Sequence, residues 1–244
     1  MLGADGRVYA FGDASGMGSP AGPTVAIAAR PGGHGYWTVD AAGNVSHFGT
    51  AAAHGGHPAL RFGETVSTIS ATPSGNGYWL FTNRGRAFPF GDAHFFGDMS
   101  RVALNGPIVA SVATSTGRGY YMIGSDGGVF SFGDARFHGS TASMRLNRPI
   151  VGIAPTPNNR GYWLVASDGG VFAFNAPFRG SMGAVRLNKP VAGLVAFGTG
   201  YLMVANDGGV FDFSNKAFVG SLANNPPSAP IVGIAAFTTQ GPGS

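Results

Sequence analysis

The chain has 244 residues, no cysteine and a net charge of +4, from 15 Lys and Arg against 11 Asp and Glu. Charged residues make up only 11% of it and glycine contributes 42 positions. This composition excludes a disulfide scaffold, thiol chemistry and a charge-rich disordered chain. No apolar run approaches the ~18 residues of a membrane-spanning helix, and no signal peptide is visible at Met1.

The first predicted element is half of a β-hairpin. Asp5-Gly6 is a tight-turn sequence, and residues 7–11 after it end in an aromatic strand pattern. The complete hairpin recurs down the chain, with its opening tyrosine at intervals of 42, 42, 42 and 39 residues: Tyr36, Tyr78, Tyr120, Tyr162 and Tyr201.

The clearest copy of the hairpin spans residues 161–174. Apolar side chains alternate with period two on both sides of Asp168-Gly169-Gly170, which is typical of two strands joined by a tight turn. An apolar strand precedes each hairpin, beginning with Pro-Ile-Val at residues 107, 149 and 230, and a Phe-x-Gly segment follows four of the hairpins. We therefore expect four strands per unit, in the best copy near residues 149–155, 161–167, 170–175 and 177–181.

Four strands in 40–45 residues are typical of a β-propeller blade. We predict one all-β domain spanning residues 1–244, a six-bladed propeller with four-stranded antiparallel blades. The blades are expected at about residues 23–58, 65–104, 107–146, 149–187, 190–226, and 230–244 together with 1–18.

The last of these blades joins the two ends of the chain. The C-terminal strand is expected to be its innermost strand and the N-terminal residues its outer strands, which closes the ring and removes exposed sheet edges. The aromatic pair of the other hairpins is missing here, because its position falls on Gly243 and Ser244.

The units resemble tandem repeats found at the ends of secreted actinobacterial proteins, often beside hydrolase or cell-wall domains. The likeness covers the whole chain and is carried by residues 149–154, 161–168 and 128–135; residues 44–50 depart most from it. The resemblance implies a β-propeller in an extracellular or cell-envelope setting. It implies no reaction.

Acidic residues are candidate catalysts, because glycoside hydrolysis needs two carboxylates at a defined separation. Seven of the eleven fall in repeated turns, where an Asp side chain can bond the backbone two residues on. Acids that break the repeat are the better catalytic candidates: Asp40, Glu64 and Asp212. With so few, we expect no enzymatic activity and no catalytic residue.

The sequence predicts no cofactor, either from its histidines or from a nucleotide-binding motif. His47, His54 and His57 lie close in sequence, but a zinc site needs three or four convergent ligands, so no metal site is expected. No phosphate loop or dinucleotide fingerprint is present.

The aromatic pairs support two interpretations, packing between blades or stacking platforms for sugar rings. We expect the basic residues in the connections between blades to lie on one face, where the turn aspartates reduce the positive charge. The candidate ligand-binding residues are Trp37, Trp79, Tyr121, Trp163, Arg101, Arg145 and Arg186.

The favoured function is a non-catalytic binding module, lectin-like or directed to a cell-wall glycan, with repeated sites that gain avidity. The alternatives are a structural or protein-interaction scaffold in a larger extracellular assembly, and a glycan-processing enzyme. Expected partners are a glycan or cell-wall polymer, a protein, or linked domains of a longer parent protein. Neither nucleic acid nor a membrane is expected as a partner.

Overall fold

The protein is all-β in the computed structural model, which describes residues 1–237. The described residues form five three-stranded antiparallel sheets and one two-stranded sheet, with no helix among them. The predicted all-β class is therefore confirmed. No helix in this part of the chain is long and apolar enough to cross a membrane.

The three strands of each sheet follow one another both in the chain and in the sheet. The sheets contain β2 (Ala26–Ala29), β3 (Gly35–Val39) and β4 (Val45–Gly49); β5 (Val66–Ala71), β6 (Gly77–Thr82) and β7 (Ala87–Gly91); β8 (Ile108–Ala113), β9 (Gly119–Gly124) and β10 (Val129–Gly133); β11 (Ile150–Pro155), β12 (Tyr162–Ala166) and β13 (Val171–Phe174); β14 (Val191–Phe197), β15 (Gly200–Ala205) and β16 (Val210–Phe213). The two-stranded sheet contains β1 (Leu2–Gly3) and β17 (Ile231–Gly233).

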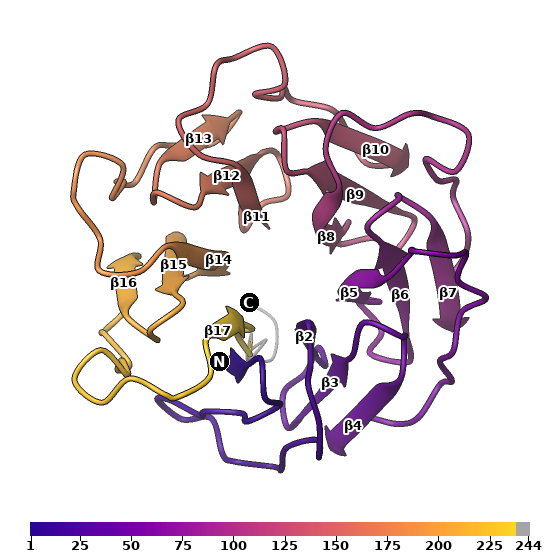
Figure 1. Ribbon diagram of the computed structural model, residues 1–244, viewed down its shortest axis with the longest axis horizontal. Helices are drawn as coiled ribbons and strands as arrows, with labels where there is room; N and C mark the ends of the chain where they lie inside the picture. Colours follow the sequence, from indigo (N-terminus) through magenta and orange to yellow (C-terminus); the bar gives the residue numbers. More distant parts are fainter. Residues whose placement is uncertain (238–244) are drawn as a thin grey trace.

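The sheets are arranged like the blades of a propeller. Figure 1 shows them around a central opening, with the first strand of each unit innermost. One cavity is lined by three consecutive residues from each of the innermost strands, for example Val151, Gly152 and Ile153 of β11. Corresponding residues of all six units therefore surround the same space.

The predicted hairpin is confirmed in the clearest copy, with strands one residue shorter at each end than the predicted 161–167 and 170–175. Tyr162 pairs with Phe174 and Trp163 with Ala173 across β12 and β13. Gly169 in the turn has a φ of 84°, which a residue with a side chain rarely adopts. The Asp168 carboxylate accepts a hydrogen bond of 3.0 Å from the Gly170 N–H, as the turn sequence predicts.

The prediction of a fourth strand in each unit is wrong, because each complete sheet contains three strands. Residues 177–181 are not part of a strand. Side chains bind the backbone of this segment instead: Trp163 Nε1 donates to the Pro177 carbonyl at 2.8 Å, and the Tyr201 hydroxyl donates to the Gly180 carbonyl at 2.5 Å. Carbonyls of the segment are bonded in this way without a fourth strand in the ladder.

The hydrophobic core is divided between neighbouring sheets. Each of its clusters combines residues of two successive units, and the largest side chains in it are fully buried. Burial of such aromatic side chains supplies much of the apolar area that stabilises a fold of this kind.

The first and the last described strands form one sheet, as predicted. β1 pairs antiparallel with β17, with Leu2 opposite Gly233, and Figure 1 shows the two strands side by side. The innermost strand of this sheet ends at Gly233, and the chain is described as far as Phe237. Gly243 and Ser244, at the expected position of the missing aromatic pair, lie outside the described residues.

Candidate functional site

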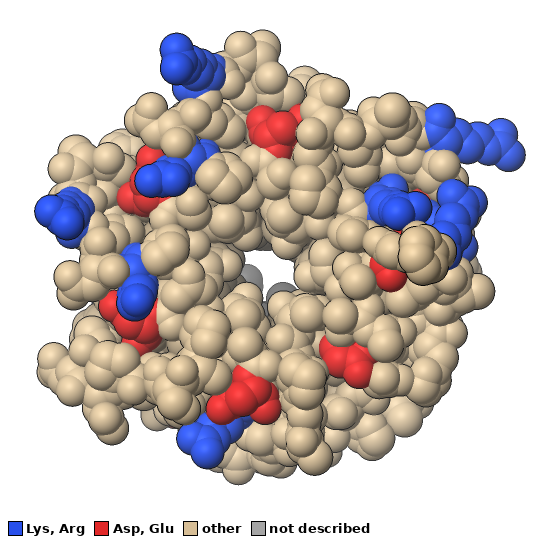
Figure 2. Space-filling model, viewed as in Figure 1, with Lys and Arg blue, Asp and Glu red and all other residues tan. Residues whose placement is uncertain are grey.

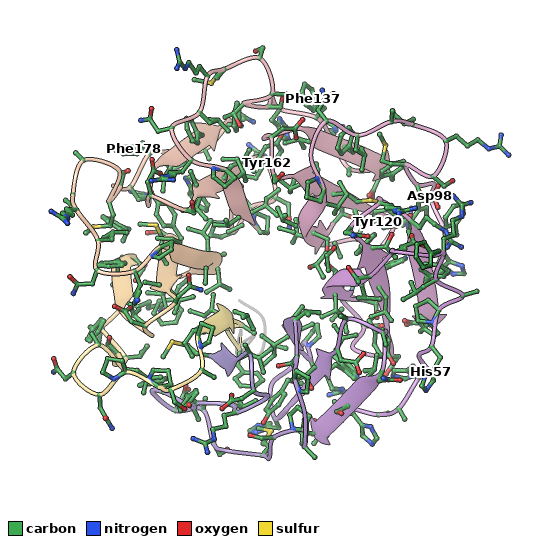
Figure 3. All side chains as sticks on the ribbon, viewed as in Figure 1. His57, Asp98, Tyr120, Phe137, Tyr162 and Phe178 are labelled. Carbon is green, nitrogen blue, oxygen red and sulfur yellow. The ribbon has the colours of Figure 1, made fainter. Side chains whose placement is uncertain are left out.

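A hydrogen bond from tyrosine to glycine joins each complete sheet to the segment before it. The first aromatic residue of each middle strand donates its hydroxyl hydrogen to a glycine carbonyl of the preceding unit, at 2.5 to 2.6 Å. The pairs are Tyr36 with Gly18, Tyr78 with Gly55, Tyr120 with Gly97, Tyr162 with Gly139, and Tyr201 with Gly180. Two of these tyrosines, Tyr120 and Tyr162, are labelled in Figure 3.

Burial keeps these hydroxyl groups protonated. It raises the pKa of Tyr120 to about 12, although hydrogen bonds with the backbone of Phe96 and Gly97 act in the opposite direction. The hydroxyl therefore remains a hydrogen-bond donor through the neutral and mildly alkaline range.

The second aromatic residue of each pair points to the opposite face, as the period of two predicts. Its ring lies 5.1 to 5.5 Å from the tyrosine ring of the next sheet, centroid to centroid. Trp37, Trp79 and Trp163 are fully buried, and Tyr121 is 7% exposed. These four candidate ligand residues therefore serve packing in this structure, and a sugar could stack on them only if the sheets separated.

The exposed aromatic rings are different residues. Four phenylalanines stand at equivalent positions, two residues before the glycines of the interblade segments. Their exposed fractions are 56%, 59%, 61% and 56% for Phe95, Phe137, Phe178 and Phe218. We call this set the phenylalanine array; Figure 3 labels two of its members, Phe137 and Phe178, near the circumference of the molecule.

A basic side chain accompanies each member of the array. His94 and Arg136 directly precede a phenylalanine, Arg179 directly follows one, and Lys216 lies two residues before the last. All four are exposed. An aromatic face beside a cationic donor is suited to a ring-shaped ligand that carries hydroxyl or acidic groups.

A separate cavity of about 400 Å³ is lined by three arginines. Arg61, Arg84 and Arg86 contribute to it, together with Asn83 and Ser100. Arg84 stands where four of the other hairpin turns have aspartate and one has alanine, so a positive charge replaces a negative one in this unit. We call it the arginine cavity; its donors could bind a carboxylate, sulfate or phosphate group.

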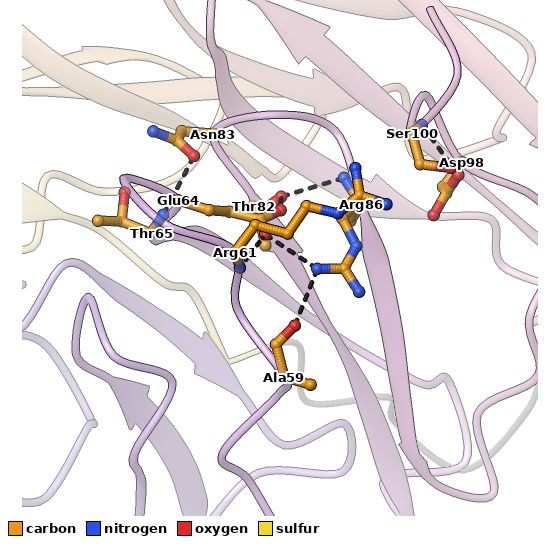
Figure 4. Close-up of polar contacts among 9 residues, drawn as sticks. All are labelled: Ala59, Arg61, Glu64, Thr65, Thr82, Asn83, Arg86, Asp98 and Ser100. Carbon is orange, nitrogen blue, oxygen red and sulfur yellow. Dashed lines mark hydrogen bonds and ion pairs between the residues drawn. The ribbon is translucent and has the colours of Figure 1, made fainter.

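Glu64 anchors this cavity through an ion pair. Its carboxylate lies 2.9 Å from Arg86 Nη1 and accepts a 2.6 Å hydrogen bond from the Thr82 hydroxyl. Burial by itself raises the pKa of Glu64, but the hydrogen bonds from Thr82, the Arg61 N–H and Arg86 outweigh it and hold the pKa below its ordinary value. Figure 4 shows these contacts and the second bond of Arg86, to the Ala59 carbonyl.

The other predicted basic residues are exposed but are not gathered into one site. Arg101, Arg145 and Arg186 lie in successive connections between sheets. Figure 2 shows basic side chains spread along the rim of this face, with acidic side chains among and inside them. The expected dilution of positive charge is therefore visible on this face.

The acids that break the repeat all have structural contacts. Asp40 accepts hydrogen bonds from the N–H groups of Ala42 and Asn44, and Asp212 from that of Ser214. Glu64 belongs to the ion pair described above. Each of these three carboxylates is thus already engaged in shaping a turn or anchoring a side chain.

The histidines of the first complete unit do not converge. The His54 ring packs edge-on against Tyr78, with 5.9 Å between centroids, and His138 has the equivalent contact with Tyr162. Within residues 1–237, no group of three or more His, Asp or Glu side chains is placed to hold a metal ion.

The exposure of the phenylalanine array is not predicted by the sequence. The recurring Phe-x-Gly spacing identifies the four positions, but the segments lie outside the strands, so no alternation rule gives the side on which the rings lie. In comparisons with known proteins, no family model and no curated protein matches the chain.

Proposed function

We propose that this protein is a non-catalytic, lectin-like binding module for an anionic glycan or cell-wall polymer. The phenylalanine array supplies the stacking platforms, and the neighbouring basic side chains and the arginine cavity hold acidic groups. The scaffold in this proposal is a six-bladed propeller, closed where the N- and C-terminal strands pair, in an extracellular or envelope setting.

The observation that carries the proposal is that four equivalent phenylalanine rings are each more than half exposed, on a protein whose three tryptophans are fully buried. Exposed apolar groups of this size commonly mark contact surfaces. The C–H face of a sugar ring packs on an aromatic ring, while nearby polar groups orient it. Since the four sites repeat around the molecule, a polymer could engage several at once and gain avidity.

The test is binding of cell-wall polysaccharide and of a glycan array by a variant with all four array residues changed to serine. Phe95, Phe137, Phe178 and Phe218 are exposed, so the variant should keep its fold. Each site should contribute weakly, and loss of all four should lower polymer binding by about 10²-fold or more. Short oligosaccharides should lose less, because they gain no avidity.

Phe62 provides the matched control. It is fully exposed but lies outside the array, so Phe62→Ser should bind like the parent. Unchanged polymer binding by the fourfold variant would refute the assignment of the array, and Arg84→Ala should weaken only ligands that carry acidic groups.

A protein-interaction scaffold is the second candidate, favoured by a different observation. Val102, Met144 and Val185 are each more than half exposed and lie in the connections between sheets. If this face binds a protein, serine at these three positions should abolish capture of that partner and leave polysaccharide binding intact.

A further inference from the structure

Two of the three guanidinium groups in the arginine cavity are free to bind a ligand. Arg61 and Arg84 are exposed, and within residues 1–237 neither guanidinium has a hydrogen bond or an ion pair. The Arg84 guanidinium lies over the backbone of Gly63, where a side-chain carbon would come within 3.2 Å of Nη2. Arg84 therefore reaches from its hairpin turn to the loop that carries Arg61.

The third guanidinium is held in place by Glu64. The Glu64 carboxylate accepts a 2.8 Å hydrogen bond from the Arg61 N–H, which shapes the loop, and pairs with Arg86 Nη1 at 2.9 Å. The Arg86 guanidinium also lies 4.6 Å from the centroid of the Phe88 ring. Its Nε and Nη2 groups donate to no described residue. A ligand would meet these donors already oriented, which lowers the entropic cost of binding.

The cavity has an excess of two positive charges. Three arginines and no acid line it, and Glu64 behind Arg86 supplies one negative charge. Asp98 and Arg101, on the segment that contributes Ser100, are of opposite sign, and neither lines the cavity. Figure 2 shows basic side chains next to one another over β6 and β7. A ligand that balances this charge carries two negative charges.

A phosphomonoester matches the cavity better than other acidic groups do. A carboxylate or a sulfate ester carries one negative charge, and a single guanidinium fork binds both oxygens of a carboxylate. A phosphomonoester carries a charge of about −1.5 to −2 at pH 7 and has three strong acceptor oxygens. It can therefore accept hydrogen bonds from Arg61, Arg84 and Arg86 together. The cavity volume of about 400 Å³ is in the range of small-ligand sites.

Neutral polar groups beside the arginines suit a sugar. Asn83 Oδ1 accepts a 3.1 Å hydrogen bond from the Thr65 N–H, which leaves the amide nitrogen of Asn83 to donate. The Ser100 hydroxyl and the Asn105 amide also line the cavity, and no described residue is hydrogen-bonded to these two side chains. A few such groups beside a charged anchor can orient the hydroxyls of a sugar.

We propose that the arginine cavity binds the phosphomonoester group of a phosphorylated sugar. The three arginines hold the phosphate oxygens, and the neutral side chains beside them contact the sugar hydroxyls. The assignment rests on the proposed function, which gives this cavity to the acidic groups of a glycan, and it names the group. It does not require the phenylalanine array.

The test is isothermal titration calorimetry of the complete 244-residue protein with four ligands: glucose 6-phosphate, glucose 6-sulfate, glucuronic acid and glucose. At pH 7.5 we expect glucose 6-phosphate to bind at least about tenfold more tightly than the two singly charged ligands, because it has an additional charge and acceptor oxygens. Glucose should give no measurable binding.

The pH dependence of binding gives a second measurement. The second pKa of a phosphomonoester is about 6, so glucose 6-phosphate should bind roughly fivefold more weakly at pH 5 than at pH 7.5. Glucose 6-sulfate keeps its single charge and should bind equally at both values. It therefore controls for titration of protein groups near the cavity, Asp98 among them. The pKa of Glu64 is held below its ordinary value, so its ion pair persists over this range.

Arg84→Asp is the decisive variant, because four other hairpin turns have aspartate at this position. Its melting temperature should differ from that of the parent by no more than about 2 °C, while its affinity for glucose 6-phosphate should fall by more than about tenfold. Arg118→Ala is the control: Arg118 is exposed in the loop between β8 and β9, and its removal should leave binding unchanged.

Equal affinity for the phosphate and the sulfate, or parent-like binding by Arg84→Asp, would overturn the proposal. Tighter binding of O-phosphoserine than of glucose 6-phosphate would also overturn it, because the cavity would then be assigned to a phosphoprotein. The proposed function fails separately. Polymer binding that survives the fourfold phenylalanine variant refutes the array alone, whereas a protein that binds polymer but does not distinguish phosphate from sulfate refutes only the phosphomonoester assignment.

Discussion

Replacing Trp163 by alanine should destabilise the protein strongly. The side chain is fully buried, its ring lies 5.1 Å from that of Tyr201, and its Nε1 donates to the Pro177 carbonyl. Truncation of a core tryptophan to alanine typically costs about 3–5 kcal/mol. At about 2–4 °C per kcal/mol for a chain of this size, the melting temperature should fall by roughly 6–20 °C.

Trp163→Leu should cost less, because the next sheet already has a leucine at this position. Leu202 occupies the equivalent site and is 4% exposed. The substitution keeps much of the apolar contact. It loses the hydrogen bond, worth about 1 kcal/mol, and the aromatic pairing, worth about 0.5–1.5 kcal/mol. We expect a total near 2 kcal/mol and a fall of roughly 4–8 °C.

Both variants can be compared by near-ultraviolet circular dichroism during heating and by unfolding in guanidinium chloride. The exposed Phe62→Ala is the control and should change the unfolding free energy by no more than about 0.5 kcal/mol. If both Trp163 variants melt like the parent, the packing explanation fails and the tryptophans return as ligand candidates. A leucine variant as unstable as the alanine variant would refute the argument from Leu202.

Four further predictions follow from other contacts. Glu64→Gln should lower the free energy of unfolding by about 2 kcal/mol at pH 7, less than the loss of a fully buried ion pair, because Arg86 is partly exposed. Since the pKa of Glu64 is lowered in the folded state, this contribution is lost as the pH falls, and the unfolding free energies of parent and variant, measured in urea, should converge toward pH 3. Burial lowers the pKa of the Met1 amine to about 6, so the unfolding free energy should rise by about 2 kcal/mol from pH 6 to 8, a component that N-terminal acetylation removes. Gly139→Ala, at a φ of 133° against the Phe174 ring, should lower the melting temperature, whereas Gly16→Ala should not. We expect that the protein hydrolyses no glycoside. Measurable turnover of a glycoside that disappears when Asp40, Glu64 or Asp212 is replaced would contradict this expectation.

The hairpins could be predicted from sequence because their information is local. Alternation around Trp163 and the turn at Asp168 specify two strands and their pairing within fourteen residues. The contact of β1 with β17 is not local, yet the repeat predicted it, since the two partial units add to one period. The aspartate contacts in the turns were predictable for the same reason as the hairpins.

The fourth strand could not be judged from sequence, because residues 177–181 have strand-like composition but non-local partners. Whether this segment joins a β-sheet depends on which donors bind its carbonyls. In this structure the donors are side chains, Trp163 from its own sheet and Tyr201 from the next. Exposure of Phe178 depends on the same contacts. The ion pair of Glu64 with Arg86 joins residues 22 positions apart and has no counterpart among the described residues of the other units. The repeat pattern therefore could not predict it.

The segment between two sheets has a consequence for how the molecule folds. Its carbonyls are bound by an indole or phenol from its own unit and by a tyrosine from the next, so a single unit cannot complete its own hydrogen bonds. Isolated units should therefore be unstable, and neighbours should gain stability together, as in other repeat proteins. Among the described residues, the terminal sheet has the fewest such hydrogen bonds, so unfolding is expected to spread from it rather than to begin at a random position around the molecule.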